Sequence, residues 1–147
     1  MLIRHTTTDD FSAIQKLSAH FAAHFEEPIP TLNANEVDSF FSVETPKMHA
    51  RIAEIHGEAV GFISWVLLYD IHTGLKRVFL NDLCVLQEWR GNGVGEALFK
   101  HMVQWAKMQN ARKVVWEVWD QNSTAISFYQ KQGAMLAEQV NMYQCEL

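Results

Sequence analysis

The stretch Arg90-Gly91-Asn92-Gly93-Val94-Gly95 lies between an apolar run that ends at Val85-Leu86 and an amphipathic run that begins at Val94. This order predicts a strand, a glycine-rich turn and a helix. Glycine allows backbone angles that a Cβ would forbid, and the first N–H groups of a helix have no partner within that helix. The turn can therefore bind an anion such as phosphate, although the same glycine spacing also occurs in ordinary turns.

A second informative segment is Asn122-Ser123-Thr124-Ala125-Ile126-Ser127-Phe128-Tyr129. It begins with asparagine, a favourable helix N-cap, and Gly133 is placed to end the helix. Ala125 and Tyr129 are four residues apart and share a helical face, with Phe128 beside them. Core packing is sufficient to explain Ala125 and Phe128, whereas Tyr129 carries a hydroxyl that needs a partner if it is buried.

Together the two segments resemble the GNAT superfamily of N-acetyltransferases. The first is similar to the family's Arg/Gln-x-x-Gly-x-Gly/Ala loop for the pyrophosphate of acetyl-CoA, at Arg90, Gly93 and Gly95. The second is similar to the family's Asn-x-x-Ala-x-x-Phe-Tyr helix. Two motifs in the expected order are more specific than either alone. The resemblance covers residues 2–147.

Within the superfamily, residues 79–85 and 122–134 are most similar to diamine and polyamine N-acetyltransferases and their small bacterial relatives. Those enzymes usually carry Glu-Asp where this chain has Asn81-Asp82. This chain therefore lacks one of the two carboxylates at that place.

The chain of 147 residues is expected to form one N-acetyltransferase domain over residues 1–147. The pattern predicts a mixed α/β fold with one central sheet, and the resemblance implies the GNAT-type sheet, mostly antiparallel, twisted and flanked by helices. We expect strands at 2–5, 49–55, 59–69, 76–86, 113–119 and within 140–147. We expect helices from about Phe11 until Pro28, at 35–41, at 94–109 and after Asn122 until Gly133.

Composition and motifs argue against several kinds of partner, location and metal site. The net charge of −5 argues against nucleic-acid binding and suits a cationic substrate. No apolar run approaches the length of a membrane span, and the N-terminus lacks a signal-peptide pattern, so a cytoplasmic location is expected. Cys84 and Cys145 match no metal-binding spacing and are expected to be buried free thiols, and the histidines form no convincing zinc motif, so we predict no metal.

The resemblance implies how acetyl-CoA, the expected cosubstrate, is bound. The glycine loop would bind the pyrophosphate, and two splayed strands ending near Val85 and Trp119 would admit the pantetheine arm. The backbone around Leu83 to Val85 would pair with this arm and meet the oxyanion. The expected cofactor-binding residues are Leu83, Cys84, Val85, Arg90, Gly91, Asn92, Gly93, Val94, Gly95, Asn122, Ala125, Phe128, Tyr129 and Lys131.

Two residues are the catalytic candidates. The resemblance implies that Tyr129 gives a proton to the departing sulfur, and a phenol with a pKa of about 10 stays protonated at neutral pH. Asp82 is the candidate base, with Glu88 and, through water, Glu117 as alternatives; a strand carboxylate is also a common structural acceptor. The expected substrate-binding residues are Glu26, Glu27, Asn81 and Asp82.

We therefore expect an acetyltransferase that transfers the acetyl group directly to a primary amine, namely a small cationic amine of the diamine or polyamine type. Two alternatives stay open: an acetyltransferase of protein N-termini or lysines, and a non-catalytic regulator that binds acetyl-CoA. The resemblance also implies a homodimer.

Overall fold

The computed structural model describes residues 1–41, 47–137 and 144–145. The chain divides into two compact parts, Met1–Trp116 and Glu117–Leu147. The first part contains a sheet, helices α1, α2 and α3 and two short 3-10 helices, Thr8–Asp10 and Gln87–Trp89. The second contains helix α4, Ser123–Lys131.

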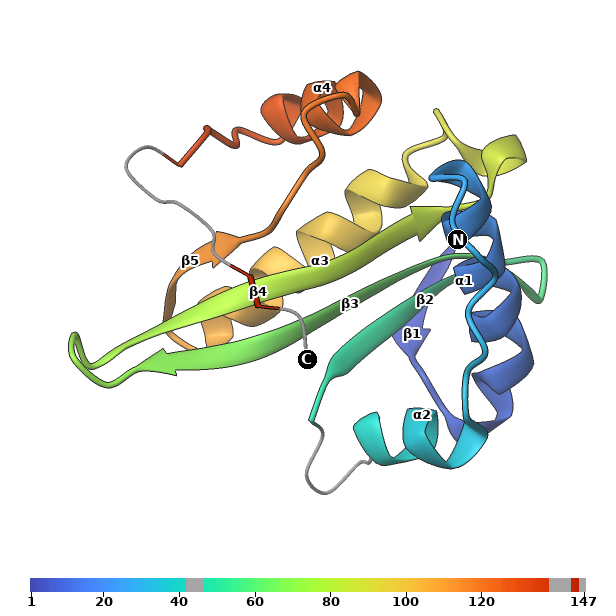
Figure 1. The fold of residues 1–147 in the computed structure, drawn as a ribbon, viewed down its shortest axis with the longest axis horizontal. Helices are drawn as coiled ribbons and strands as arrows, with labels where there is room; N and C mark the ends of the chain where they lie inside the picture. Colours follow the sequence, from blue (N-terminus) through green and yellow to red (C-terminus); the bar gives the residue numbers. More distant parts are fainter. Residues whose placement is uncertain (42–46, 138–143, 146–147) are drawn as a thin grey trace. The chain divides into compact units, whose positions relative to one another are not determined.

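The sheet has five strands in the order β1-β2-β3-β4-β5 (Figure 1). Their bounds are β1 Leu2–His5, β2 His49–Ile55, β3 Glu58–Asp70, β4 Leu75–Val85 and β5 Ala111–Val115. Strands β1 to β4 pair antiparallel with their neighbours, and β5 pairs parallel with β4. The expectation of a mixed, mostly antiparallel sheet is thus confirmed for these strands.

Helices cover both faces of this sheet (Figure 1). Helix α1, Phe11–His24, and helix α2, Ala34–Phe40, lie on one face, and helix α3, Val94–Met108, lies on the other. The core on the α1 face consists of Ile14, Leu17, Ala50, Ile52, Phe62, Cys84 and Leu86. On the α3 face, a Cβ at Gly61 would lie 2.8 Å from the Cys84 carbonyl oxygen and 3.3 Å from Leu98. Only glycine therefore fits where α3 crosses β3.

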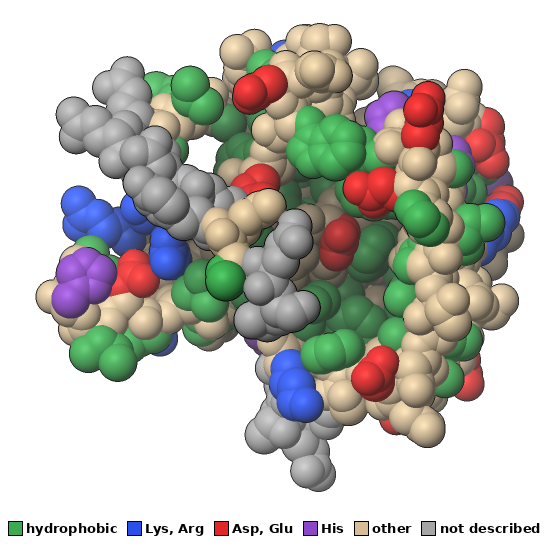
Figure 2. Space-filling view, viewed as in Figure 1, with side chains coloured by type: hydrophobic (Ala, Val, Ile, Leu, Met, Phe, Trp, Pro, Cys, Tyr) green, Lys and Arg blue, Asp and Glu red, His purple; other side chains and the backbone are tan. Residues whose placement is uncertain are grey.

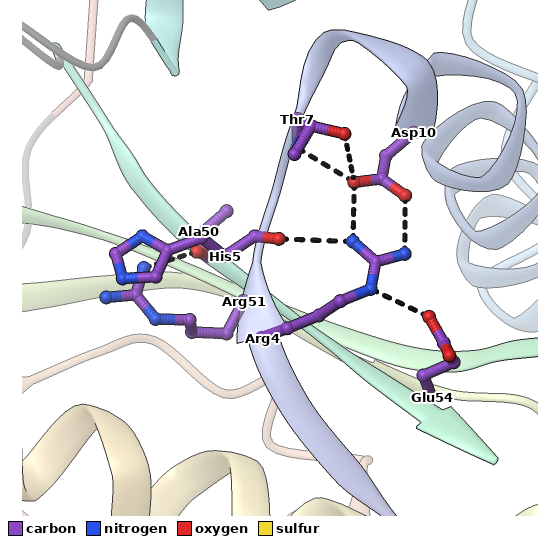
Figure 3. Close-up of polar contacts among 7 residues, drawn as sticks. All are labelled: Arg4, His5, Thr7, Asp10, Ala50, Arg51 and Glu54. Carbon is purple, nitrogen blue, oxygen red and sulfur yellow. Dashed lines mark hydrogen bonds and ion pairs between the residues drawn. The ribbon is translucent and has the colours of Figure 1, made fainter. Parts of the chain in front are cut away.

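An arginine ties the first strand to the first helix (Figure 3). Arg4 donates to both carboxylate oxygens of Asp10 at 2.8 Å, and its Nε donates to Glu54 at 2.7 Å. Asp10 also accepts from the backbone N–H of Thr7 at 2.8 Å. The hydrogen bonds from Arg4 are the main reason that the pKa of Asp10 lies below its ordinary value.

Several sequence expectations need correction. Helix α1 ends at His24, before Pro28, because the N–H of Phe25 bonds back to Ala22 and Glu26 takes a left-handed φ of 56°. Strand β5 ends at Val115 and not at residue 119, because its ladder with β4 stops there. Cys145 is exposed, whereas burial was expected. The expected strand within 140–147 lies mostly outside the described residues.

A buried arginine lies among histidines on the α3 face. Arg51 is only 6% exposed, lies 5.4 Å from the ring of Trp65, and donates from Nε to Nε2 of His101 at 3.1 Å. The imidazole can accept this bond only when it is neutral at Nε2. Burial lowers the pKa values of His5, His49 and His101, and the charge of Arg51 adds to the effect.

This cluster predicts acid sensitivity. Below pH 6.5, the ordinary value, the unfolded chain takes up protons on these histidines before the folded protein does. The contribution of these histidines to the free energy of unfolding is therefore fully present above pH 6.5. It is lost as the pH falls toward their lower pKa values in the folded protein. Denaturant unfolding at pH 7.5 and pH 5 measures the loss. His101→Gln, which keeps an acceptor without a titrating ring, should reduce it, and an equal loss in this variant would contradict the assignment to His101.

Candidate functional site

The glycine loop has the conformation that its sequence suggests. Gly91 and Gly93 have φ values of 77° and 79°, in the left-handed region, and Gly93 is the N-cap of α3. A Cβ at either glycine would meet no atom within 4 Å. Glycine is therefore required here by the backbone angles, and the space beside the loop is open. The first intrahelical bond runs from Ala97 to Gly93, so the preceding N–H groups of α3 point out of the helix.

Arg90 holds the loop in place. Its Nε donates to the carbonyl of Val85 at 3.0 Å, and its Nη2 lies 3.3 Å from Nε2 of His20 on α1. The side chain of Asn92 donates to the carbonyl of Arg90 at 3.1 Å. Burial, followed by the charge of Arg90, lowers the pKa of His20. Arg90 thus links the loop to β4 and α1, and its expected role in binding the cofactor stays a prediction.

Among the described residues, no strand pairs with one edge of β4 at its C-terminal end. The β4–β5 ladder ends at the pair Phe79 and Val115, and no later residue of β4 pairs with β5 among the described residues. The N–H of Leu86 bonds to Val60 of β3, so by alternation the backbone groups of Val85 and Leu83 point to the opposite edge. The bond from Arg90 to the carbonyl of Val85 agrees with this direction.

The thiol of Cys84 faces the core and not this edge. It is 2% exposed and lies 3.5 Å from the carbonyl of Leu17, to which it donates. Burial raises its pKa to about 11. The thiol stays protonated at neutral pH, so Cys84 can contribute only its backbone to a site at the edge.

Asp82 lies on the α1 face of β4, where it accepts a hydrogen bond from the hydroxyl of Ser64 on β3 at 2.5 Å. Burial raises the pKa of the Asp82 carboxyl, and the hydrogen bond from Ser64 opposes this shift. Figure 2 views this face and shows acidic atoms among hydrophobic side chains beside α1. A carboxylate in such surroundings is a candidate general base.

The side chains of the other expected substrate-binding residues make no hydrogen bond or ion pair with Asp82 in the described part of the chain. Asn81 is exposed at the register shift between β3 and β4. Glu26 and Glu27 are exposed after α1, and no hydrogen bond or ion pair in the described part of the chain connects them to Asn81 or Asp82. Glu88, an alternative base, is exposed in the 3-10 helix after β4.

Helix α4 begins and ends as its sequence predicts. The Asn122 side chain accepts from the N–H of Ala125 at 3.0 Å, and Gly133 has a φ of 82°. Phe128 and Tyr129 are half-buried, with their rings edge to face and 5.1 Å between centroids. Lys131 is exposed. These residues belong to the second part of the chain, so their place beside the thioester stays a prediction.

Two contacts of the site were missed by sequence reasoning. The first is that of Ser64 with Asp82. Ser64 is the one hydroxyl residue within the apolar run 59–68, and a hydroxyl in such a run could have indicated a buried polar contact. The second contact is that of His20 on α1 with Arg90. Nothing local in the sequence relates His20 to Arg90, which is far away along the chain.

Residues 13–134 match the model of the acetyltransferase (GNAT) family. The chain belongs to this family. The match includes the glycine loop, the end of β4 and helix α4, so the predicted GNAT resemblance is confirmed.

Curated GNAT relatives have several specificities in their names. A putative [ribosomal protein bS18]-alanine N-acetyltransferase of Bacillus subtilis is 29% identical over 65% of this chain and 61% of its own length. A thialysine N-epsilon-acetyltransferase of Mus musculus is 30% identical over 62% of this chain and 58% of its own. A spermidine/spermine N(1)-acetyltransferase-like protein 1 of Homo sapiens is 28% identical over 90% of this chain and 20% of its own length. The chain thus spans about three fifths or less of these relatives.

A solved aminoglycoside acetyltransferase from an uncultured soil metagenomic sample has the same fold. Its TM-score is 0.83 at 18% identity, and the superposition covers 99% of this chain and 95% of the other. The predicted GNAT-type α/β fold is confirmed. Within the described residues, no group of three or more His, Cys, Asp or Glu side chains could hold a metal ion, and no helix is long and apolar enough to cross a bilayer.

Proposed function

We propose that this GNAT protein transfers the acetyl group of acetyl-CoA directly to a small cationic primary amine. The observation that carries the proposal is the glycine loop, with two left-handed glycines at the start of α3. It follows the end of β4, where one edge has no partner strand among the described residues. The outward N–H groups of the loop and helix suit a pyrophosphate, and the edge suits an extended amide-containing arm.

The proposed reaction uses groups on both parts of the chain. An alkyl ammonium has a pKa of about 10.4, so Asp82 first accepts a proton from it. The amine nitrogen then bonds to the thioester carbon, while backbone N–H groups near Leu83 and Val85 meet the oxyanion. The C–S bond breaks, and the thiolate takes a proton from Tyr129. The second nitrogen proton restores the tyrosine, and Asp82 releases its proton to water.

Two observations support a cationic acceptor. The described residues place no cationic side chain against Asp82, and Ser64 is its hydrogen-bond partner. Two of the relatives above are named for acceptors that carry amino groups, thialysine and spermidine or spermine. A partly buried carboxylate without a counter-ion favours an ammonium group.

The test is release of free coenzyme A from acetyl-CoA with a panel of acceptors. Diamines, polyamines and thialysine should stimulate release, and neutral amides of the same length should not. If all small amines fail while a peptide with a free N-terminus succeeds, the acceptor class proposed here is wrong.

A second candidate is acetylation of a protein N-terminus. It is favoured by the relative named for ribosomal protein bS18 alanine. A peptide that begins with alanine therefore belongs in the same panel. Binding of acetyl-CoA without release by any acceptor would instead favour the third hypothesis from the sequence, a regulator.

The loop proposal predicts a loss of acetyl-CoA affinity in Gly93→Val. A β-branched residue is strained at a φ of 79°, so the loop should leave its present conformation, and the dissociation constant measured by calorimetry should rise at least about tenfold. Gly57→Val is the matched control, because Gly57 has a φ of 80° in the β2–β3 turn and a Cβ there would also meet no atom within 4 Å. Equal affinities in both variants would remove the loop from the site.

Three further expectations stay proposals: a single domain over residues 1–147, a homodimer and a cytoplasmic location. Catalysis without a metal is also proposed. Turnover that is unchanged after dialysis against a chelator is the expected result for that last point.

A further inference from the structure

Ser64 is in an unusual place for a hydroxyl. It is completely buried on β3, and its neighbours in the sequence are apolar. Its cross-strand partner in the ladder is Asp82, and its Oγ donates to Oδ2 of that carboxylate at 2.5 Å. The pair lies immediately before the register shift at Ser64/Trp65. The two strands therefore hold this contact in position, independent of any loop.

The second oxygen of Asp82, Oδ1, has no hydrogen-bond or ion-pair partner within residues 1–41, 47–137 and 144–145. Among the described residues, the fully buried side-chain polar atoms without a hydrogen-bond partner are Nε1 of Trp65 and Nε of Arg77, and Oδ1 of Asp82 is not one of them. Asp82 as a whole is half-buried. One oxygen is held from within the sheet, and the other has no partner among the described residues.

The described side chains packed on the same face as the pair are mostly apolar, and the charge of Arg90 acts on the neighbouring thiol of Cys84. Helix α1 packs on this face with Ile14 and Leu17, and α2 adds Val37. The thiol of Cys84 on β4 stays protonated, and His20 of α1 contacts Arg90. Besides burial, the hydrogen bond from Ser64 is the contact that acts on the Asp82 carboxylate.

We propose that Ser64 is a positioning residue for acetyl transfer, which holds Oδ2 of Asp82 so that Oδ1 faces the acceptor amine. The inference rests on the proposed function and deepens it. A hydrogen bond to the charged carboxylate favours the ionised form and opposes the effect of burial. Ser64 therefore keeps Asp82 ready to accept a proton from an ammonium, and it fixes which oxygen does so.

The direct test is the pKa of Asp82 in the free protein, followed by carboxyl-carbon NMR and assigned by the resonance that Asp82→Asn removes. Ser64→Ala should raise this pKa by roughly one unit, because the hydrogen bond that stabilises the charge is lost. Ser64→Thr keeps a hydroxyl and should retain a value near that of the wild type. An unchanged pKa in Ser64→Ala overturns the proposal.

Kinetics provide the second readout. The acid limb of the kcat/KM profile for the amine should move upward in Ser64→Ala by the same roughly one unit, with acetyl-CoA affinity within about twofold of the wild type. Ile52→Val is the matched control, since it removes one buried carbon from the same core face and should leave the profile in place. A profile that shifts equally in Ile52→Val would show a packing effect and overturn the positioning role.

The two readouts separate this inference from the function on which it rests. The NMR measurement needs no acceptor, so it tests the contact between Ser64 and Asp82 even when no amine is acetylated. If Ser64→Ala shifts the pKa but Asp82→Asn has wild-type turnover, the base role and with it the positioning role are wrong. If Asp82→Asn is inactive and Ser64→Ala leaves the pKa unchanged, only the inference about Ser64 fails.

Discussion

Tyr129→Phe is expected to lower kcat by about ten- to a thousandfold, with little change in the affinity for acetyl-CoA. The substitution keeps the ring, and therefore its edge-to-face contact with Phe128, but removes the hydroxyl. The proposed role of that hydroxyl is to protonate the departing coenzyme A sulfur. Turnover should be measured at saturating amine, and calorimetry should give the acetyl-CoA dissociation constant of the same variant.

Tyr69→Phe is the matched control for the loss of a phenol. Tyr69 is 60% exposed near the end of β3 and has no assigned role. Its variant should keep the wild-type kcat. Wild-type turnover in Tyr129→Phe, under conditions in which chemistry limits the rate, would show that Tyr129 is a packing residue and that another acid protonates the sulfur.

The second large effect is expected from Asp82→Asn. The amide has nearly the same shape and can still accept the bond from Ser64, but it cannot take a proton from an ammonium. We expect kcat/KM for the amine to fall by about a hundred- to ten-thousandfold, the usual contribution of a general base. A pH profile of the wild type should show an acid limb above 3.8, the ordinary value, because burial raises the pKa of Asp82.

A carboxylate outside the site provides the comparison for Asp82. Glu58 is exposed at the start of β3 and pairs with Lys16 at 3.1 Å. Glu58→Gln should leave kcat/KM unchanged. If Asp82→Asn loses less than about twofold, the proton leaves through water or through another group, and Glu88 becomes the next base to test.

Local signals were sufficient for most of the fold. The alternating and apolar runs around β2, β3 and β4 predicted strands close to the observed bounds, since burial of one strand face depends on side chains two residues apart. Asn122 and Gly133 marked the ends of α4 because capping is a local interaction. The predicted end of β5 was wrong: its pairing stops at Phe79 and Val115 although β4 continues to Val85, and residue type does not show where two strands separate.

The candidate site likewise has features that the sequence identified and contacts that only the tertiary structure shows. The glycine loop was identified from its residues, because a left-handed backbone strongly favours glycine wherever the rest of the chain lies. The contacts of Arg90 with Val85 and of Ser64 with Asp82 could not be derived in this way. Each depends on strand register or on the packing of a helix against the sheet.

By itself, the sequence determined the family, the order of strands and helices, the glycine loop and the capped helix α4. These features follow from residue type and from spacing along the chain, which act over a few residues. Tertiary structure decided which oxygen of Asp82 is held, where Arg90 points and which thiol is buried. Those outcomes depend on groups such as Ser64 and His20 that are distant in sequence and meet only when the strands pair and the helices pack.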